Sequence, residues 1–281
     1  MAVACLVALL GCSLASAPAP APAPSLVEEP LPTSRPPRTG VVVDHVLTYP
    51  DGRRVQLARG WGVTGIARYG DGYLVADNRY FEGTVGMQRL DADGLVVESW
   101  TSTGSPLVAP DGQVAWVSMI APESGETGPT LIHVGERTQE LTGMFSPYLQ
   151  SFDGETVTFS ARTLIRGRWP AVTYATDLVD PPRRIGTAPH FARYYSPSGQ
   201  NWYGFRRRSL LLATPQGETS IPARSLIRTW GVLFWEDDQH LLGTYARGGR
   251  MAVARIDLSG SISIASPWRR RDLDGFAFLS R

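Results

Sequence analysis

Residues 109–118 read APDGQVAWVS, a tight turn followed by a short run of strand-forming residues. Six turns of this kind precede apolar runs in the chain: Gly70-Asp71-Gly72, Pro110-Asp111-Gly112, Phe152-Asp153-Gly154, Pro197-Ser198-Gly199, Asp237-Asp238-Gln239 and Leu273-Asp274-Gly275. Successive turns are 36 to 45 residues apart. This period is typical of the blades of a β-propeller and differs from that of helical repeats. The spacing therefore predicts an all-β chain built from consecutive units of sheet.

Each repeat has room for four short strands, because a second turn follows about twenty residues after the first. These later turns lie at Asp91–Gly94, Gly135–Arg137, Asp180–Pro182, Pro215–Gly217 and Leu258–Gly260. One strand remains at the C-terminus, at Phe276–Ser280, and a hairpin is expected between Val41 and Leu57. Joining the ends gives a composite blade with two strands from each terminus, which would leave no open sheet edge. We expect a six-bladed β-propeller over residues 40–281, with seven blades as the alternative.

Two repeats resemble a known family. Ala109-Pro110-Asp111-Gly112 before Val114–Ser118, and Tyr195-Ser196-Pro197-Ser198-Gly199, are similar to the S-P-D-G repeat of TolB-type β-propellers. The resemblance implies an exported scaffold that binds proteins or other ligands. TolB proteins carry an additional N-terminal α/β domain, whereas a proline-rich segment occupies that position here, so a role in the Tol–Pal system is not implied.

The first 17 residues are typical of an export signal: an apolar run followed by small residues, too short for a membrane-spanning helix. Leu9-Leu10-Gly11-Cys12 resembles a bacterial lipobox, which would make Cys12 a lipid anchor at the cell surface or in the periplasm. Ala15-Ser16-Ala17 is a competing cleavage site, so simple secretion is the alternative. Residues 18–39 are rich in proline and predict an extended stalk.

Signals for catalysis or cofactor binding are missing from the sequence. Cys5 and Cys12 both lie in the leader, and the four histidines show no metal-ligand spacing. The chain has no G-x-S-x-G, P-loop or dinucleotide motif, and its formal net charge of +1 gives no reason to expect nucleic acid. We therefore expect no cofactor, no metal and no catalytic residues. A propeller hydrolase or lyase that acts on an anionic polymer is the alternative.

Charge is distributed unevenly between the predicted connections. The first and third turns of the repeats are short and rich in aspartate, whereas the second connections are longer and rich in arginine. Arginine pairs well with carboxylate and phosphate groups. The residues expected to form an anionic-ligand face are Arg79, Arg166, Arg168, Arg247 and Arg250. The sequence thus favours a non-enzymatic, monomeric binding scaffold of the cell envelope, whose partner is a protein or an anionic ligand and which contacts the membrane only through its lipid anchor.

Overall fold

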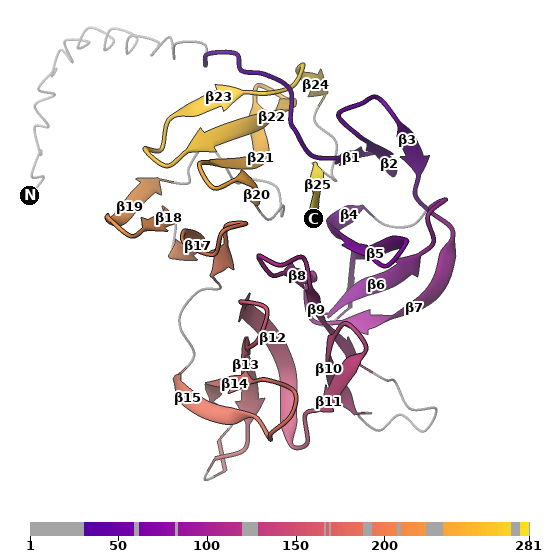
Figure 1. Ribbon diagram of the computed structural model, residues 1–281, viewed down its shortest axis with the longest axis vertical. Helices are drawn as coiled ribbons and strands as arrows, with labels where there is room; N and C mark the ends of the chain where they lie inside the picture. The colour runs from indigo at the N-terminus through magenta and orange to yellow at the C-terminus, as the bar shows by residue number, and fades with distance from the viewer. Residues whose placement is uncertain are drawn as a thin grey trace, which may run out of the picture. The chain divides into compact units, whose positions relative to one another are not determined.

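The computed structural model describes residues 31–281 apart from 59–61, 82–83, 120–128, 166, 169, 188–192, 207–208, 223–232, 271–275 and 281. The described residues belong to one compact unit, Leu31–Arg281. Every regular element among them is a strand (Figure 1). The prediction of an all-β fold is therefore confirmed.

Most strands follow one another in antiparallel groups of four. The first group comprises β4 (Val63–Tyr69), β5 (Gly72–Phe81), β6 (Thr84–Leu90) and β7 (Val96–Ser102). The second comprises β8 (Leu107–Val108), β9 (Val114–Met119), β10 (Thr130–Val134) and β11 (Arg137–Glu140). A single pair, Thr101 with Met119, joins β7 to β9, so the first two groups belong to one larger sheet. The third comprises β12 (Met144–Phe152), β13 (Val157–Thr163), β14 (Ala171–Thr176) and β15 (Arg183–Thr187).

Two further groups follow along the chain. One comprises β16 (Tyr194–Tyr195), β17 (Trp202–Arg206), β18 (Ser209–Thr214) and β19 (Gly217–Pro222). The other comprises β20 (Phe234–Asp237), β21 (His240–Arg247), β22 (Arg250–Asp257) and β23 (Ile262–Ile264), and the short β24 (Arg269–Arg270) also pairs with β22. The turns expected from the sequence lie between the first and second strands of these groups. Glycines such as Gly112 and Gly199 have a positive φ in these turns, a backbone conformation that glycine adopts at little cost.

The two ends of the chain share a sheet. β25 (Ala277–Ser280) pairs with β1 (Val41–Val43), which pairs with β2 (Val46–Thr48), which in turn pairs with β3 (Arg54–Gln56). Figure 1 shows β25 beside β1 and β4, and β25 and β4 run parallel. The sequence predicted two strands from each terminus. Among the described residues this part of the sheet instead has one C-terminal strand and three N-terminal strands, because Val41–Leu47, expected as one strand, forms both β1 and β2.

A single tight turn divides Val41–Leu47, which was expected to be one strand, into β1 and β2. Asp44 and His45 both have a positive φ, of 50° and 62°, and Val43 pairs with Val46 across them. This geometry is that of a two-residue hairpin, which usually carries Asn-Gly or Asp-Gly. Because histidine is uncommon at such a position, the sequence between Val41 and Leu47 reads as one strand.

Buried side chains collect between neighbouring groups rather than within one of them. One cluster contains Val117 and Ile132 from the second group together with Phe159 and Tyr174 from the third. Another joins β17 and β18 to β20, β21 and β22. Sheets that pack face to face in this way hold their side chains in fixed positions relative to one another. In the described part of the chain, no helix is long and apolar enough to cross a membrane.

Candidate functional site

A cavity of about 560 Å³ lies where the first strands of the groups meet. Its lining includes residues of β4, β8, β12, β16, β20 and β25. A volume of several hundred Å³ with a mixture of apolar and polar walls is typical of ligand sites. We call this space the inner-strand cavity.

The rim of the inner-strand cavity is formed by the turns that follow the first strands. Asp111 and Asp238 lie in two of these turns and both line the cavity. The Asp111 carboxylate accepts a hydrogen bond from the backbone N–H of Gln113 at 3.0 Å, within its own turn. The Asp238 carboxylate accepts one from the N–H of Ser198 at 2.9 Å, which links two turns 40 residues apart. The aspartates interpreted as turn residues thus also define an acidic rim.

The same turns approach one another closely. A Cβ placed on Gly199 would lie 3.3 Å from Pro110 Cγ, and Gly199 has a φ of +73°. Gln113 also donates a side-chain hydrogen bond to the carbonyl of Gly154 at 3.3 Å. Contacts between separate turns hold the rim in one arrangement, which lowers the entropic cost of binding.

Two rim carboxylates are held in the ionised form. Burial of the Asp237 carboxyl raises its pKa, but the N–H of Gln239 and the side chain of His240 stabilise the anion, and the net pKa is lowered. Burial likewise raises the pKa of Asp238, and hydrogen bonds from Ser198 outweigh that effect and lower it. Both groups therefore carry a negative charge at neutral pH.

One wall of the cavity is aromatic. Tyr194 and Tyr203 stack with ring centroids 4.8 Å apart, and Trp235 Nε1 donates to the Tyr194 carbonyl at 2.8 Å. The Tyr203 hydroxyl donates to the carbonyl of Leu233. Burial raises the pKa of both tyrosines well above the usual value, so these hydroxyls stay protonated. The wall offers fixed rings rather than groups that exchange protons.

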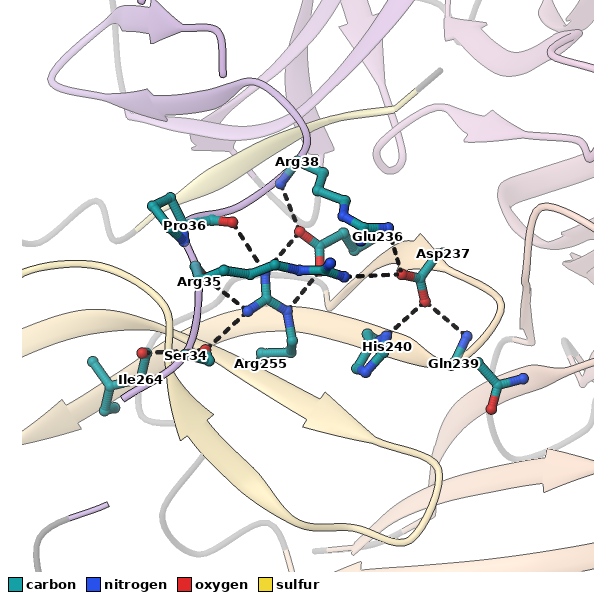
Figure 2. A network of polar contacts seen from close by, with 10 residues as sticks. All are labelled: Ser34, Arg35, Pro36, Arg38, Glu236, Asp237, Gln239, His240, Arg255 and Ile264. Carbon is teal, nitrogen blue, oxygen red and sulfur yellow. Dashed lines mark hydrogen bonds and ion pairs between the residues drawn. The ribbon is translucent and has the colours of Figure 1, made fainter. Parts of the chain in front are cut away.

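A segment near the N-terminus crosses the edge of the β20–β23 sheet (Figure 2). The N–H of Ile264 donates to the Pro32 carbonyl at 2.8 Å, and the N–H of Ser34 donates to the Ile264 carbonyl at 2.7 Å. We call residues 31–38 the N-terminal strap. They were assigned to the stalk in the sequence analysis, and in the structure they are hydrogen-bonded to the sheet.

Arg255 fastens the strap. Its Nη1 donates to Ser34 Oγ at 2.9 Å and to the Arg35 carbonyl at 2.8 Å, and its Nη2 donates to the Pro36 carbonyl at 3.2 Å. The same guanidinium is paired with Glu236, and both side chains are buried (Figure 2). One side chain thus connects three positions of the strap to the sheet.

The strap also contacts residues that line the cavity. The N–H of Arg38 donates to Glu236 Oε1 at 2.6 Å. Arg35 and Arg38 lie 3.8 and 3.7 Å from the Asp237 carboxylate. Glu236 and Asp237 both line the cavity, so Arg255 balances the charge of one lining carboxylate and the strap arginines lie beside the other.

The comparisons with known proteins agree with this architecture. No protein-family model and no curated protein matches the chain. Among solved structures, TolB from Acinetobacter baumannii is similar, with a TM-score of 0.51 and 13% sequence identity over 86% of this chain. The chain spans 66% of the length of that protein, slightly less than two-thirds.

Two other structures show the same kind of likeness. A TolB-like structure from Agrobacterium tumefaciens has a TM-score of 0.47 at 14% identity and covers 85% of this chain and 91% of its own. The β-propeller domain of the Trilobed protease from Pyrococcus furiosus has a TM-score of 0.36 at 11% identity, with 74% and 86% covered. The likeness to the Acinetobacter baumannii structure shows that the fold of this chain is a TolB-like β-propeller. At this level of identity the similarity concerns the fold alone.

The propeller brings only some of the predicted arginines together. Arg247 and Arg250 are direct cross-strand partners at the ends of β21 and β22, and both are exposed. Arg168 is exposed in the short turn between β13 and β14, which belongs to another sheet. Of the predicted arginines whose side chains are described, none lines the inner-strand cavity.

The remaining predicted site residues lie wholly or partly outside the described part of the propeller. Cys12 and Arg166 are outside it, and Arg79 is described only as a position in β5. Their roles stay predictions. Among the described residues, no group of three histidine, cysteine or acidic side chains is arranged to hold a metal ion.

Arg255 and Glu236 were not among the site residues predicted from the sequence. Arg255 interrupts the apolar run of β22, whose neighbouring residues are all buried. A charged residue inside a buried strand needs a partner, so this position carried a signal for a buried ion pair. The identity of the partner, 19 residues earlier, could not be deduced from that signal.

Proposed function

We propose that the propeller has six blades and closes through the sheet shared by the two ends of the chain. The composite blade would be β25, β1, β2 and β3. Support comes from the pairs Val41–Phe278 and Val42–Ala277, and from the N–H of Leu279, which donates to the Gly40 carbonyl at 2.9 Å. The cavity lining supports the same count, because it includes residues of β4, β8, β12, β16, β20 and β25, one strand for each proposed blade.

We further propose that this propeller is a non-enzymatic binding protein and that its ligand enters the inner-strand cavity across the acidic rim. The supporting observation is the pair of carboxylates Asp111 and Asp238 beside a cavity with an aromatic wall. Both carboxylates accept hydrogen bonds from uncharged donors: Asp111 from Gln113 N and Nε2 at 3.0 and 2.6 Å, and Asp238 from the N–H of Ser198 at 2.9 Å. They are therefore available to a cation from outside.

The chemistry of the cavity selects for a cationic group on an apolar body. The carboxylates at the rim favour an ammonium or guanidinium group, and Tyr194 and Trp235 favour an apolar or aromatic body. A lysine or arginine side chain in a peptide segment of a partner protein fits both requirements. Arg193, a basic residue of the lining whose guanidinium carbon lies 4.7 Å from the Trp202 ring centroid, would disfavour a second positive charge nearby.

A direct test uses short peptides that differ at one position. Peptides with a central lysine, norleucine or glutamate would be titrated into the protein while tryptophan fluorescence is followed. We expect the lysine peptide to bind more tightly than the other two. The double variant Asp111→Asn/Asp238→Asn should weaken that binding about tenfold, as expected for the loss of charge-assisted hydrogen bonds.

Asp91→Asn provides a matched control, because Asp91 also caps a turn, accepting from the N–H of Asp93 at 3.0 Å, but does not line the cavity. It should leave peptide binding unchanged. If no lysine peptide binds, or if the double variant binds as well as the unaltered protein, the cavity is not a site for cations.

We also propose that the protein is exported and is held at the membrane by a lipid on Cys12, with simple secretion as the alternative. The support is the lipobox-like Leu9-Leu10-Gly11-Cys12 and the proline-rich residues that follow it. The partner of the propeller would then be a component of the cell envelope.

A further inference from the structure

The carboxylates that line the inner-strand cavity differ in the groups that hold them. Glu236 is paired with the guanidinium of Arg255, and both side chains are buried. The Asp237 carboxylate lies 3.8 and 3.7 Å from Arg35 and Arg38 of the N-terminal strap. A cationic ligand at either carboxylate would compete with positive charges that the protein itself supplies.

Asp238 is held by uncharged donors instead. Its carboxylate accepts from the N–H of Ser198 at 2.9 Å, and the hydroxyls of Ser198 and Ser196 also bond to it. Such donors stabilise the anion without neutralising its charge. Asp111 is likewise bonded to the uncharged Gln113, but Asp111 is exposed whereas Asp238 is half-buried. Because Coulombic attraction is stronger where water screens it less, Asp238 is the better acceptor for a cation.

A buried amide fixes the backbone of the same residue. Asn201 Nδ2 donates to the Asp238 carbonyl at 2.7 Å, and Asn201 is only 5% exposed. Asn201 is itself held by Ser196: its N–H donates to Ser196 Oγ at 3.2 Å, and its carbonyl accepts from the Ser196 N–H at 2.9 Å. The turn between β16 and β17 is thus bonded to both the carbonyl and the carboxylate of Asp238, which belongs to the next blade.

We infer that Asp238 is the carboxylate that receives the cationic group of the ligand, and that Asn201 is a positioning residue that holds Asp238 in place for it. This inference rests on the proposed function of the inner-strand cavity and assigns its charge specificity to one residue. A carboxylate held at two points before the ligand arrives loses little freedom on binding, which favours affinity. Selection of a positive charge then depends on a contact between two neighbouring blades.

The test measures charge selectivity, defined as the ratio of the affinities of the full chain for the lysine peptide and the norleucine peptide. Asp238→Asn should abolish most of this selectivity, and Asp111→Asn should reduce it less. Asn201→Ala should lower it about fivefold, the value expected for one hydrogen bond, while the norleucine peptide binds as before. A merely structural role of Asn201 would weaken both peptides alike. Ser198→Ala, at an exposed position, should lower the selectivity in the same direction without risk to folding.

Gln139→Ala is the matched control. Gln139 Nε2 donates to the Asp180 carbonyl at 2.7 Å, so the variant also removes a bond from a side-chain amide to the backbone of an aspartate about 40 residues later, and neither residue belongs to the described lining of the cavity. It should leave the selectivity unchanged. If Asn201→Ala and Ser198→Ala keep the selectivity of the unaltered protein, or if Asp111→Asn loses more of it than Asp238→Asn, the inference is overturned while the cavity remains a site for cations. If the unaltered protein binds no lysine peptide, the proposed function fails and the inference fails with it.

Discussion

Arg255 and Glu236 are joined by two nearly parallel hydrogen bonds, from Nε to Oε2 at 2.7 Å and from Nη2 to Oε1 at 2.9 Å. Their side chains are only 5% and 0% exposed. Buried charges of this kind are tolerated because each satisfies the other, and Arg255 uses its remaining donors on the N-terminal strap. This ion pair therefore connects the N-terminal strap, through Arg255 on β22, to Glu236 on β20, which lines the cavity.

Replacing Glu236 with glutamine should destabilise the propeller strongly. The variant leaves the Arg255 guanidinium buried without a counter-charge, and breaking a buried pair in this way costs about 3–5 kcal/mol of unfolding free energy. Urea denaturation would measure the loss. Glu98→Gln is the control, since Glu98 and Arg89 form a 3.4 Å pair with side chains 60% and 43% exposed, and its effect should stay below about 1 kcal/mol. Similar losses in both variants would mean that Arg255 is adequately solvated without Glu236.

The N-terminal strap should contribute to stability, whereas the residues before it should not. A chain that begins at residue 39 lacks the Ser34, Arg35 and Pro36 oxygens that accept from Arg255. Hydrogen bonds to a charged group contribute roughly 1.5–3 kcal/mol, so we expect a clearly lower melting temperature. A chain that begins at residue 31 keeps those acceptors and should melt like the full chain. Identical melting of the two truncated chains would contradict the assigned role of the strap.

Pairing between the two ends of the chain leads to a separate prediction. Deleting residues 277–281 removes β25, which pairs with both β1 and β4 and contributes the buried Phe278. Two strand edges would be left without partners, and open edges promote aggregation. We expect loss of cooperative unfolding or precipitation, detected by circular dichroism and light scattering. Cooperative melting at the temperature of the full chain would mean that the proposed closure contributes little.

Much of the fold could be predicted because its signals are local. Turns such as Pro110–Gly112 carry residues that tolerate a positive φ, and Gly112 has a φ of 86°. The strands after these turns are buried and apolar, as for Val114–Val117 on β9. Residues that determine a turn lie within four positions of one another, so no long-range information is needed to find them.

The missed features depend on contacts between distant residues. The strap reads as a proline-rich linker, yet Arg255 reaches Ser34 across 221 positions in the sequence. The inner-strand cavity is likewise lined by residues from strands spread over most of the chain, so no single segment of the sequence predicts it. The predicted arginine face was inferred from the composition of the second connections and the face on which they are expected to emerge, and only the strand register shows that Arg247 and Arg250 are direct partners.

The proposed lipid anchor is tested in the native host. Cys12→Ser removes the only thiol in the lipobox-like sequence, so the variant should not be lipidated. We expect the unaltered protein in the membrane fraction and the variant either unprocessed or released. Labelling with a radioactive fatty acid and fractionation would measure both. Recovery of the unaltered protein entirely in the medium, with its mature end at Pro18, would support simple secretion instead.

Stability should depend on pH through His133. Its Nε2 lies 2.7 Å from Ser118 Oγ, and its ring stacks on Trp116 with centroids 4.8 Å apart. Burial lowers the pKa of His133 below its usual value of 6.5, and Glu98 offsets this only in part. His133 therefore binds a proton more readily in the unfolded chain than in the folded one. The stability that neutral His133 contributes is fully present above pH 6.5 and is lost as the pH falls through the folded-state pKa. His133→Gln should therefore flatten the decline of unfolding free energy between about pH 7.5 and 5.5, measured by urea denaturation at each pH. Equal slopes for the variant and the unaltered protein in that window would assign the pH dependence to other groups.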